Sequence, residues 1–321
     1  MAGLLRRVLD HLAGSAATPA ERRAEDEVRP DYDELARLLS SQPGFRVLKA
    51  IDTGAGVDTL RAPSSGERVA AVVDTETTGL DPVADRIIEI AVQRFTFDTD
   101  HRVTEVERPR SWLEDPGRTL PANIARLTGL SDADLTGQRF DYEAIIAMIG
   151  GADIVIAHNA AFDRPFLDAR FPQLEGLPWA CSMSQLDWRK LGYDGRALGH
   201  LVLQSGRFFD GHRAGNDTSA LAALLGTTAA DGRTILAHMM EICERNSVRV
   251  DATGAPFEAK HALKGRGYRW DAARRVWLRE LDEAEVATER GWLDQHVYRG
   301  RGRPQLTPIT PRTRFKRNDS T

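Results

Sequence analysis

The feature that most constrains the fold is the order of apolar patterns between residues 68 and 225. The run RVAAVVD is followed by RIIEIAVQRFTF and then by the more polar RVTEVERPRSWL, which predicts consecutive antiparallel strands after a buried first strand. Apolar residues at helical spacing then alternate with ADIVIAH, a short run typical of a buried strand. This order predicts an α/β domain in which a mixed β-sheet is flanked by helices.

The chain of 321 residues is longer than one core usually supports, so several regions are expected. They are an N-terminal helical and linker region over 1–66, the α/β domain over 67–230, a connecting helix and small α+β domain over 231–298, and a basic disordered tail over 299–321. In the first region, apolar spacing predicts helices over 5–12 and 32–39, separated by a linker over 14–30. The tail is rich in Arg, Pro and Thr, which argues against a packed core.

Composition excludes several classes of protein. The formal charge of -4 gives no overall attraction to nucleic acid, so any basic patch must be local. The two cysteines lack metal-ligand spacing, which argues against a disulfide framework and a zinc site. No apolar run is long enough to span a bilayer, so we expect a cytoplasmic protein with no membrane partner.

Two carboxylates, Asp74 and Glu76, follow the first apolar run in VVDTETTGL. Residues two apart on a strand share a face, so both side chains should point the same way at the carboxyl end of the strand. Like charges this close repel unless a cation lies between them, and carboxylate oxygens suit Mg²⁺ or Mn²⁺. A solvated acidic turn is the alternative, and it is favoured for this triplet taken alone.

Two later stretches carry further candidates. In IVIAHNAAFDRPFL a strand leads into a helix whose first turns hold Asp163, which reaches the same sheet edge or simply complements the helix dipole. In GHRAGNDTSALAALL, His212 and Asp217 precede or begin another helix. Taken alone, Asp217 is explained as a helix cap and His212 as a surface residue. The order and neighbours of all three stretches together favour a joint site instead.

VVDTETTGL, IAHNAAFDRPFL and HRAGND resemble the three exonuclease motifs of the DEDDh branch of the DnaQ-like 3′–5′ exonuclease superfamily, the family of the DNA polymerase III epsilon subunit. The resemblance covers about residues 68–227. It implies a ribonuclease H-like mixed β-sheet, in agreement with the order of apolar patterns.

The resemblance also implies a role for each acid. Asp74, Glu76 and Asp217 match ligands of a first metal ion, Asp74 also matches the bridge to a second ion, and Asp163 matches the acid that holds that second ion. His212 matches the general base. The implied cofactor is a pair of Mg²⁺ or Mn²⁺ ions, which together can neutralise a phosphodiester and support its leaving oxygen.

Substrate contacts are expected around the first two motifs. Related enzymes hold the terminal nucleotide with the loop that here contains Thr75, Thr77, Thr78, Gly79 and Leu80. Weaker candidates are His158, Asn159 and Phe162. Packing in the core is an equal alternative for Phe162.

The implied function is a metal-dependent 3′–5′ exonuclease that hydrolyses phosphodiester bonds at DNA 3′ ends, with single-stranded DNA as the partner, and releases nucleoside 5′-monophosphates. Its setting would be proofreading, repair or end processing, with a polymerase or repair partner or as a stand-alone nuclease. The alternatives are an exoribonuclease acting on RNA 3′ ends and a non-catalytic nucleic-acid-binding adaptor.

The C-terminal segment places aromatic residues among bases. Lys260, Lys264, Arg266 and Arg269 could hold a nucleic-acid strand by charge, with stacking on an exposed aromatic residue. For Trp270 and Trp277, a small hydrophobic core is the favoured alternative. The arginines of the tail either add affinity for nucleic acid or belong to a solvated end.

Overall fold

The computed structural model describes residues 31–272 and 274–317. The chain divides into two compact units, Met1–Val47 and Leu48–Thr321. In the first unit, helix α2 (Tyr32–Ser40) forms where apolar spacing predicts it, and the Asp31 side chain caps it by accepting from the backbone N–H groups of Asp33 and Glu34. The helix predicted over 5–12 and the linker over 14–30 lie outside the described residues.

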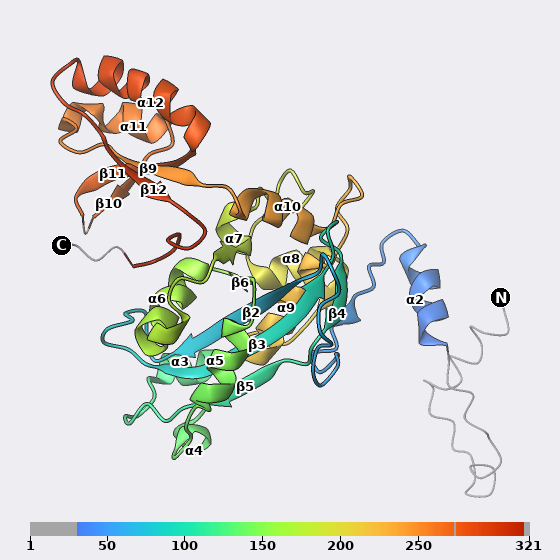
Figure 1. Ribbon diagram of the computed structural model, residues 1–321. Coiled ribbons are helices and arrows are strands. Elements are labelled where there is room, and N and C mark those ends of the chain that lie inside the picture. Colours follow the sequence, from blue (N-terminus) through green and yellow to red (C-terminus); the bar gives the residue numbers. More distant parts are fainter. Residues whose placement is uncertain (1–30, 273, 318–321) are drawn as a thin grey trace, which may run out of the picture. The chain divides into compact units, whose positions relative to one another are not determined.

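A mixed β-sheet forms the centre of the second unit (Figure 1). Within the described residues it has six strands, in the order β4-β3-β2-β6-β7, with β5 also paired to β3. Strand β2 pairs antiparallel with β3 and parallel with β6, and β7 continues the parallel part. The strands are β2 (Arg68–Thr77), β3 (Ile87–Phe97), β4 (Val103–Val106), β5 (Arg110–Leu113), β6 (Ile154–Ala157) and β7 (Trp179–Cys181).

Helices pack on both faces of this sheet, because β2 alternates its apolar side chains between two cores. Ala70 and Val72 contribute to one core, shared with α8, α9 and α10, whereas Ala71 and Val73 contribute to the other, shared with α5 and α6. The helices of this domain are α3 (Ala122–Thr128), α4 (Asp132–Leu135), α5 (Tyr142–Gly150), α6 (Ala160–Arg170), α7 (Ser182–Gln185), α8 (Leu198–Gln204), α9 (Ala214–Leu225) and α10 (Ile235–Cys243). A two-residue strand, β1 (Lys49–Ala50), pairs with β8 (Arg207–Phe208).

A second, four-stranded sheet forms the C-terminal domain, in the order β10-β11-β9-β12. Val250, Leu281 and Leu293 belong to the core that lies between this sheet and its helices. The elements are β9 (Ser247–Asp251), α11 (Lys260–Gly265), β10 (Arg269–Asp271), β11 (Val276–Asp282), α12 (Val286–Leu293), a π-helical turn (Asp294–Tyr298) and β12 (Gln305–Ile309). The predicted fold class, a ribonuclease H-like mixed sheet flanked by helices with a small α+β C-terminal domain, is confirmed.

The prediction of a disordered tail over 299–321 is wrong for its described part. Gln305–Ile309 forms β12, which pairs antiparallel with β9 over its full length. Residues 310–317, which we call the C-terminal strap, then contact the α/β domain. Composition alone misses this because β12 is stabilised by pairing with a distant strand, a contact that local propensity does not record.

Two buried arginines hold the C-terminal strap. Arg164, in α6, is fully buried and donates to the backbone carbonyls of Arg312 and Arg314, both at 2.7 Å. Arg314 is 5% exposed and donates to the carbonyls of Cys243 and Arg245, both at 2.9 Å. Because a buried guanidinium must have its donors satisfied, these contacts make the C-terminal strap part of the α/β domain's structure.

None of the helices in the described part of the chain is both long and apolar enough to cross a membrane.

Candidate active site

Strand β2 delivers Asp74 and Glu76 to one edge of the sheet. Along β2, alternate side chains point to the same face, and Asp74 and Glu76 continue the series begun by Ala70 and Val72. Their side chains therefore lie on the face covered by α9. Strand β2 has a register irregularity against β3 between Glu76 and Thr77, directly after the second carboxylate. The paired acids therefore lie at the carboxyl end of the strand and point to the same face, as the sequence spacing predicts, and the structure adds that α9 covers this face.

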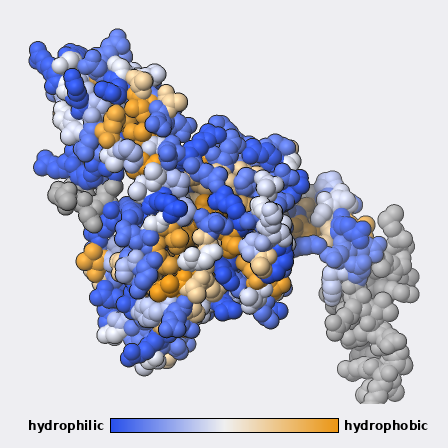
Figure 2. Space-filling view, in the orientation of Figure 1, coloured by the Kyte–Doolittle hydropathy of each residue, from blue (hydrophilic) through white to orange (hydrophobic). Residues whose placement is uncertain are grey.

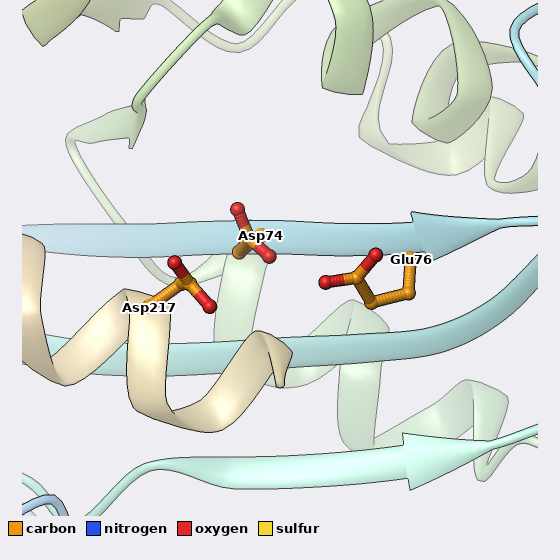
Figure 3. Close-up of side chains that lie close together, drawn as sticks. All are labelled: Asp74, Glu76 and Asp217. Carbon is orange, nitrogen blue, oxygen red and sulfur yellow. The ribbon is translucent and has the colours of Figure 1, made fainter. Parts of the chain in front are cut away.

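Helix α9 supplies the third acid, Asp217, from its first turn. Asp74, Glu76 and Asp217 each offer a carboxylate oxygen, and these atoms all lie within 4.8 Å of one another. Figure 3 shows the three side chains converging between β2 and α9. Oxygens at this spacing fit a hard divalent cation such as Mg²⁺ or Mn²⁺.

Burial gives this cluster an unusual electrostatic character. Burial raises the pKa of Asp74 well above its ordinary value, and the nearby carboxylates of Asp163 and Asp217 raise it further. Burial also raises the pKa of Glu76 to about 8, with Asp217 and Glu89 adding to the rise. Among the described residues, Asp217 Oδ2 is buried without a hydrogen-bond partner. Buried, closely spaced carboxylates, one of them with an unsatisfied oxygen, fit a site where a bound cation neutralises their negative charge.

Asp163 lies next to the cluster but is held from another side. It is 3% exposed in α6, and its Oδ1 accepts from the backbone N–H of Thr75 at 3.1 Å and from the Thr75 hydroxyl at 2.8 Å. Burial raises the pKa of Asp163 to about 7, although the bonds from Thr75 oppose this rise. Thr75, predicted as a substrate contact, thus uses its hydroxyl to orient the fourth acid.

His212 precedes α9 in an exposed loop and adopts a left-handed backbone, with φ of 66°. Burial raises the pKa of Asp217 to about 6, and the backbone N–H and ring of His212 oppose that rise. The ring therefore lies close enough to interact with the acid cluster. An exposed imidazole beside buried carboxylates can exchange protons with solvent.

Glu89, a fifth acid beside the cluster, is not among the residues predicted from the sequence. It is the cross-strand neighbour of Glu76, is 1% exposed, and pairs with Arg213 through Nε–Oε2 at 3.1 Å and Nη2–Oε1 at 3.2 Å. It also accepts from the backbone N–H of Ala214, the first residue of α9. The sequence does contain a signal for it, because an acid inside the apolar run IIEIAV requires a partner once buried.

The loop that follows β2 is built around Asp85. Thr78 is buried, and its hydroxyl donates to Asp85 Oδ1 at 3.1 Å and accepts from the backbone N–H of Arg86 at 3.0 Å. A Cβ at Gly79 would lie 2.4 Å from Asp85 Oδ2, so a larger residue there would displace the Asp85 carboxylate. The Thr77 hydroxyl donates to the carbonyl of Gly79.

Leu80 lies in this loop and is 84% exposed. The hydroxyls of Thr77 and Thr78 are thus engaged inside the loop, while Leu80 extends into solvent. A large exposed apolar side chain beside a polar site is available to contact a ligand.

The predicted contacts of the second motif have other partners. His158 Nε2 lies 2.8 Å from the carbonyl of Arg196, which can only accept, so Nε2 carries the proton and Nδ1 accepts from the Ser182 hydroxyl at 2.7 Å. Burial lowers the pKa of His158 to about 4, which keeps the ring neutral. With both nitrogens occupied, His158 braces the segment 182–196 rather than offering a donor to a ligand.

Asn159 and Phe162 lie where α6 begins. Asn159 has a left-handed backbone with φ of 107°, and its carbonyl accepts from the N–H of Phe162 at 2.7 Å. Phe162 is half-buried, packs against the core beneath α6, and lies 5.1 Å from the ring of Phe166. Phe162 thus packs on the core, as one alternative predicts, and its role as a substrate contact stays a prediction.

Comparisons with known proteins match this part of the chain. The RNase_T family model, described as an exonuclease, matches residues 71–225. A DNA polymerase III subunit epsilon of Treponema pallidum is 31% identical over 170 residues, which cover 49% of this chain and 74% of that protein. The PolC-type DNA polymerase III of Thermotoga petrophila is 31% identical over 155 residues, but the chain spans only 11% of its length.

Solved structures give weaker likenesses. Exonuclease X in complex with 5′ overhanging duplex DNA is 24% identical, with a TM-score of 0.37 over 52% of this chain and 99% of that one. Exonuclease I of E. coli in complex with a dA16 oligonucleotide is 14% identical, with a TM-score of 0.44 over 77% of this chain and 64% of that one.

Proposed function

Because the chain belongs to the RNase_T exonucleases, the DnaQ-like group that includes the DNA polymerase III epsilon subunit, we propose that it is a metal-dependent 3′–5′ exonuclease that releases nucleoside 5′-monophosphates from DNA. The observation that carries the proposal is the convergence of Asp74, Glu76 and Asp217, whose carboxylate oxygens lie within 4.8 Å of one another. Buried acids in this number favour a bound cation over a solvated acidic turn.

In this proposal, Asp74, Glu76 and Asp217 would hold one divalent ion, and Asp163 with Asp74 would hold a second. When bound, Mg²⁺ or Mn²⁺ would lower the pKa of water and neutralise the scissile phosphate. Thr75 fixes the direction of Asp163, and Glu89 with Arg213 fixes the start of α9, from which Asp217 extends. The protein residues thus arrange the negative charge before any substrate arrives.

His212 is proposed as the general base. Its ring lies beside Asp217 in an exposed loop, where an imidazole nitrogen can remove a proton from water and pass it to solvent. The carboxylates beside the ring stabilise the imidazolium that results.

Leu80 is proposed to pack under the terminal base, since it extends into solvent beside the site. The engaged Thr78 hydroxyl and the close contact of Gly79 with Asp85 hold the loop in one conformation, which lowers the entropy lost when substrate binds.

The likeness to a polymerase subunit supports DNA as the substrate and a polymerase as a partner. A 5′-labelled single-stranded DNA oligonucleotide with Mg²⁺ tests this proposal. We expect a ladder that shortens one nucleotide at a time from the 3′ end, complete loss of digestion with chelator, and loss of at least about 10³-fold in the Asp74→Asn variant, as for removal of an essential ligand.

The alternatives are outcomes of the same experiment. Digestion of a matched RNA oligonucleotide but not of DNA would assign an exoribonuclease. Binding without digestion under any metal would assign a nucleic-acid adaptor, and equal digestion by Asp74→Asn would refute the site.

A further inference from the structure

The charge of the chain is divided unequally. Residues 246–321 carry sixteen Lys and Arg against ten Asp and Glu, whereas residues 1–245 carry twenty-seven against thirty-seven. The segment that contains the acid cluster is therefore negative, and it repels a polyanionic substrate at distances beyond direct contact. A binding surface for such a substrate is expected on the C-terminal domain.

The register of the strands places several arginines at one end of the four-stranded sheet. The turn between β10 and β11 contains Arg275, and β12 begins opposite Asp251, the last residue of β9. Because Asp251 also pairs with Leu278, two residues into β11, the β10–β11 turn and the start of β12 lie at the same end. Arg269 pairs with Leu278 in the same row of residues.

The loop that enters β12 adds Arg301 and Arg303 to this end. The Tyr298 hydroxyl donates to the carbonyl of Thr253, just beyond β9, at 3.0 Å, and the N–H of Arg301 donates to the carbonyl of Tyr298 at 2.9 Å. A Cβ at Gly302 would lie 2.5 Å from the Tyr298 ring, so the loop packs closely on that ring. We call Arg269, Arg275, Arg301 and Arg303 the basic end of the sheet.

No acidic side chain in the described part of the chain neutralises these four arginines. All four are exposed, and within residues 31–272 and 274–317 none of them forms an ion pair. The buried acid at this end, Asp251, is already paired with Arg249 at 3.1 Å and with Arg274 at 2.5 Å. The guanidinium groups of the basic end are therefore available to an external anion.

An exposed aromatic ring lies beside the basic end. Trp270 is on the edge strand β10, is 50% exposed, and lies 5.6 Å from the ring of Trp277 at an interplanar angle of 58°. One face of Trp270 is thus supported while part of the ring meets solvent. Figure 2 shows hydrophilic residues over much of the C-terminal domain, which Figure 1 colours orange to red, around a smaller hydrophobic area.

We propose that the basic end binds the phosphate backbone of single-stranded nucleic acid and that a base stacks on Trp270. Charge attracts the strand without reading its sequence, and a supported indole accepts any base. A single strand is favoured because its bases are free to stack, whereas those of a duplex are not. The inference rests on the proposed nuclease function, for which this surface holds substrate outside the active site.

Binding of a fluorescent 20-nucleotide single strand to the full chain carrying Asp74→Asn tests the proposal, measured across a salt series. Arg301→Gln/Arg303→Gln is expected to weaken binding and to reduce the slope of log Kd against log salt by about 0.7 for each phosphate that the variant no longer neutralises. Arg290→Gln is the matched control, since Arg290 is exposed on α12. It should leave the slope unchanged.

Trp270→Leu is expected to raise Kd roughly 5-fold or more without changing the salt slope, and Trp270→Tyr to retain most of the affinity, since tyrosine still stacks. The loss of affinity should be equal for DNA and RNA, because phosphates and base faces are common to both. A loss confined to one of them would overturn the sugar-independent mode of binding.

Hydrolysis of a small thymidine 5′-phosphate p-nitrophenyl ester separates this inference from the proposed function. With Asp74 intact, the arginine and tryptophan variants should cleave the ester at the wild-type rate, since it reaches only the active site. If wild-type protein does not cleave the ester or an oligonucleotide, the proposed nuclease function fails. If cleavage and thermal melting are normal and all variants bind the oligonucleotide like wild type, the basic end has no such role.

Discussion

At the scale of single residues, burial rather than residue type gives the acid cluster its chemistry. Asp74 and Glu76 are ordinary carboxylates in sequence, but their surroundings favour the protonated form until a cation replaces the proton. Binding of a metal ion at this cluster would therefore displace protons, and the crowded carboxylates carry an electrostatic cost when they ionise without a cation.

The first prediction concerns how the stability of the metal-free protein depends on pH. Glu76 titrates near pH 8 in the folded protein but near its ordinary value of about 4.3 when unfolded. Between these values the folded state holds a proton that the unfolded state has released, so the free energy of unfolding falls as pH rises. Melting of metal-free protein should give a Tm that decreases from pH 5 to pH 8.

Glu76→Gln provides the control for this prediction. Glutamine cannot ionise, so the variant should gain stability over wild type progressively from pH 5 to pH 8, and saturating Mg²⁺ should remove the advantage. A difference in Tm that does not vary with pH would contradict the assignment of Glu76 as a buried, crowded acid.

A second prediction isolates the support of Asp163. Thr75→Val removes the hydroxyl that lies 2.8 Å from Asp163 Oδ1 but keeps the side-chain shape. Because Asp163 is a proposed metal ligand, loss of this orienting bond is expected to reduce metal affinity or kcat about 10–100-fold. Thr75→Ser should retain activity, whereas full activity in Thr75→Val would show that the hydroxyl does not position Asp163.

At the scale of elements, the start of α9 depends on the ion pair between Glu89 and Arg213. Arg213→Met leaves the 1%-exposed Glu89 without its cation. We expect a loss of stability of roughly 3 kcal/mol, reduced because the Arg213 side chain is itself 47% exposed.

The double variant Glu89→Gln/Arg213→Met should recover part of that stability, because no uncompensated charge remains. Denaturant unfolding measures all three proteins. A double variant that is less stable than Arg213→Met would mean that the pair does not act through buried charge.

Helix α6 is the element that links the C-terminal strap to the site, since it carries both Asp163 and Arg164. Deleting residues 310–321 removes no proposed catalytic group but removes both carbonyl acceptors of buried Arg164. Hydrogen bonds to charged groups contribute about 1.5–3 kcal/mol each, so we expect a loss of at least about 3 kcal/mol and a Tm lower by roughly 6 °C or more.

Deleting residues 318–321 alone is the matched control and should leave the Tm unchanged. Equal stability of the two truncated proteins would show that the C-terminal strap does not support α6. Arg164→Met tests the same contact from the other side and should reproduce most of the loss.

At the scale of the whole molecule, the sequence predicts those features that follow from the spacing of apolar residues within a single segment. The apolar runs of β2, β3 and β6 indicate the mixed sheet, and the alternation along β2 indicates the shared direction of Asp74 and Glu76. The motif resemblance then nominates Asp163, Asp217 and His212, although spacing alone does not bring distant segments together.

The features that the sequence does not predict all depend on contacts between distant segments. Strand β12 falls within the predicted disordered tail because its partner, β9, lies more than fifty residues away. Glu89 lies inside an apolar run whose pattern does not reveal its distant partner. The bonds of the His158 ring to Ser182 and Arg196 join segments far apart in the sequence and leave no local signal, and the motif resemblance suggests only a weaker role for His158 as a substrate contact. Tertiary pairing decides each case.

The most direct test of the central claim is the position of Mn²⁺ in crystals of the full chain, located by its anomalous scattering. We predict a strong peak bounded by the carboxylates of Asp74, Glu76 and Asp217, lost in crystals of Glu76→Gln/Asp217→Asn. A protein that digests oligonucleotides with Mn²⁺ but shows its anomalous peaks only elsewhere would contradict the assignment of this cluster as the metal site.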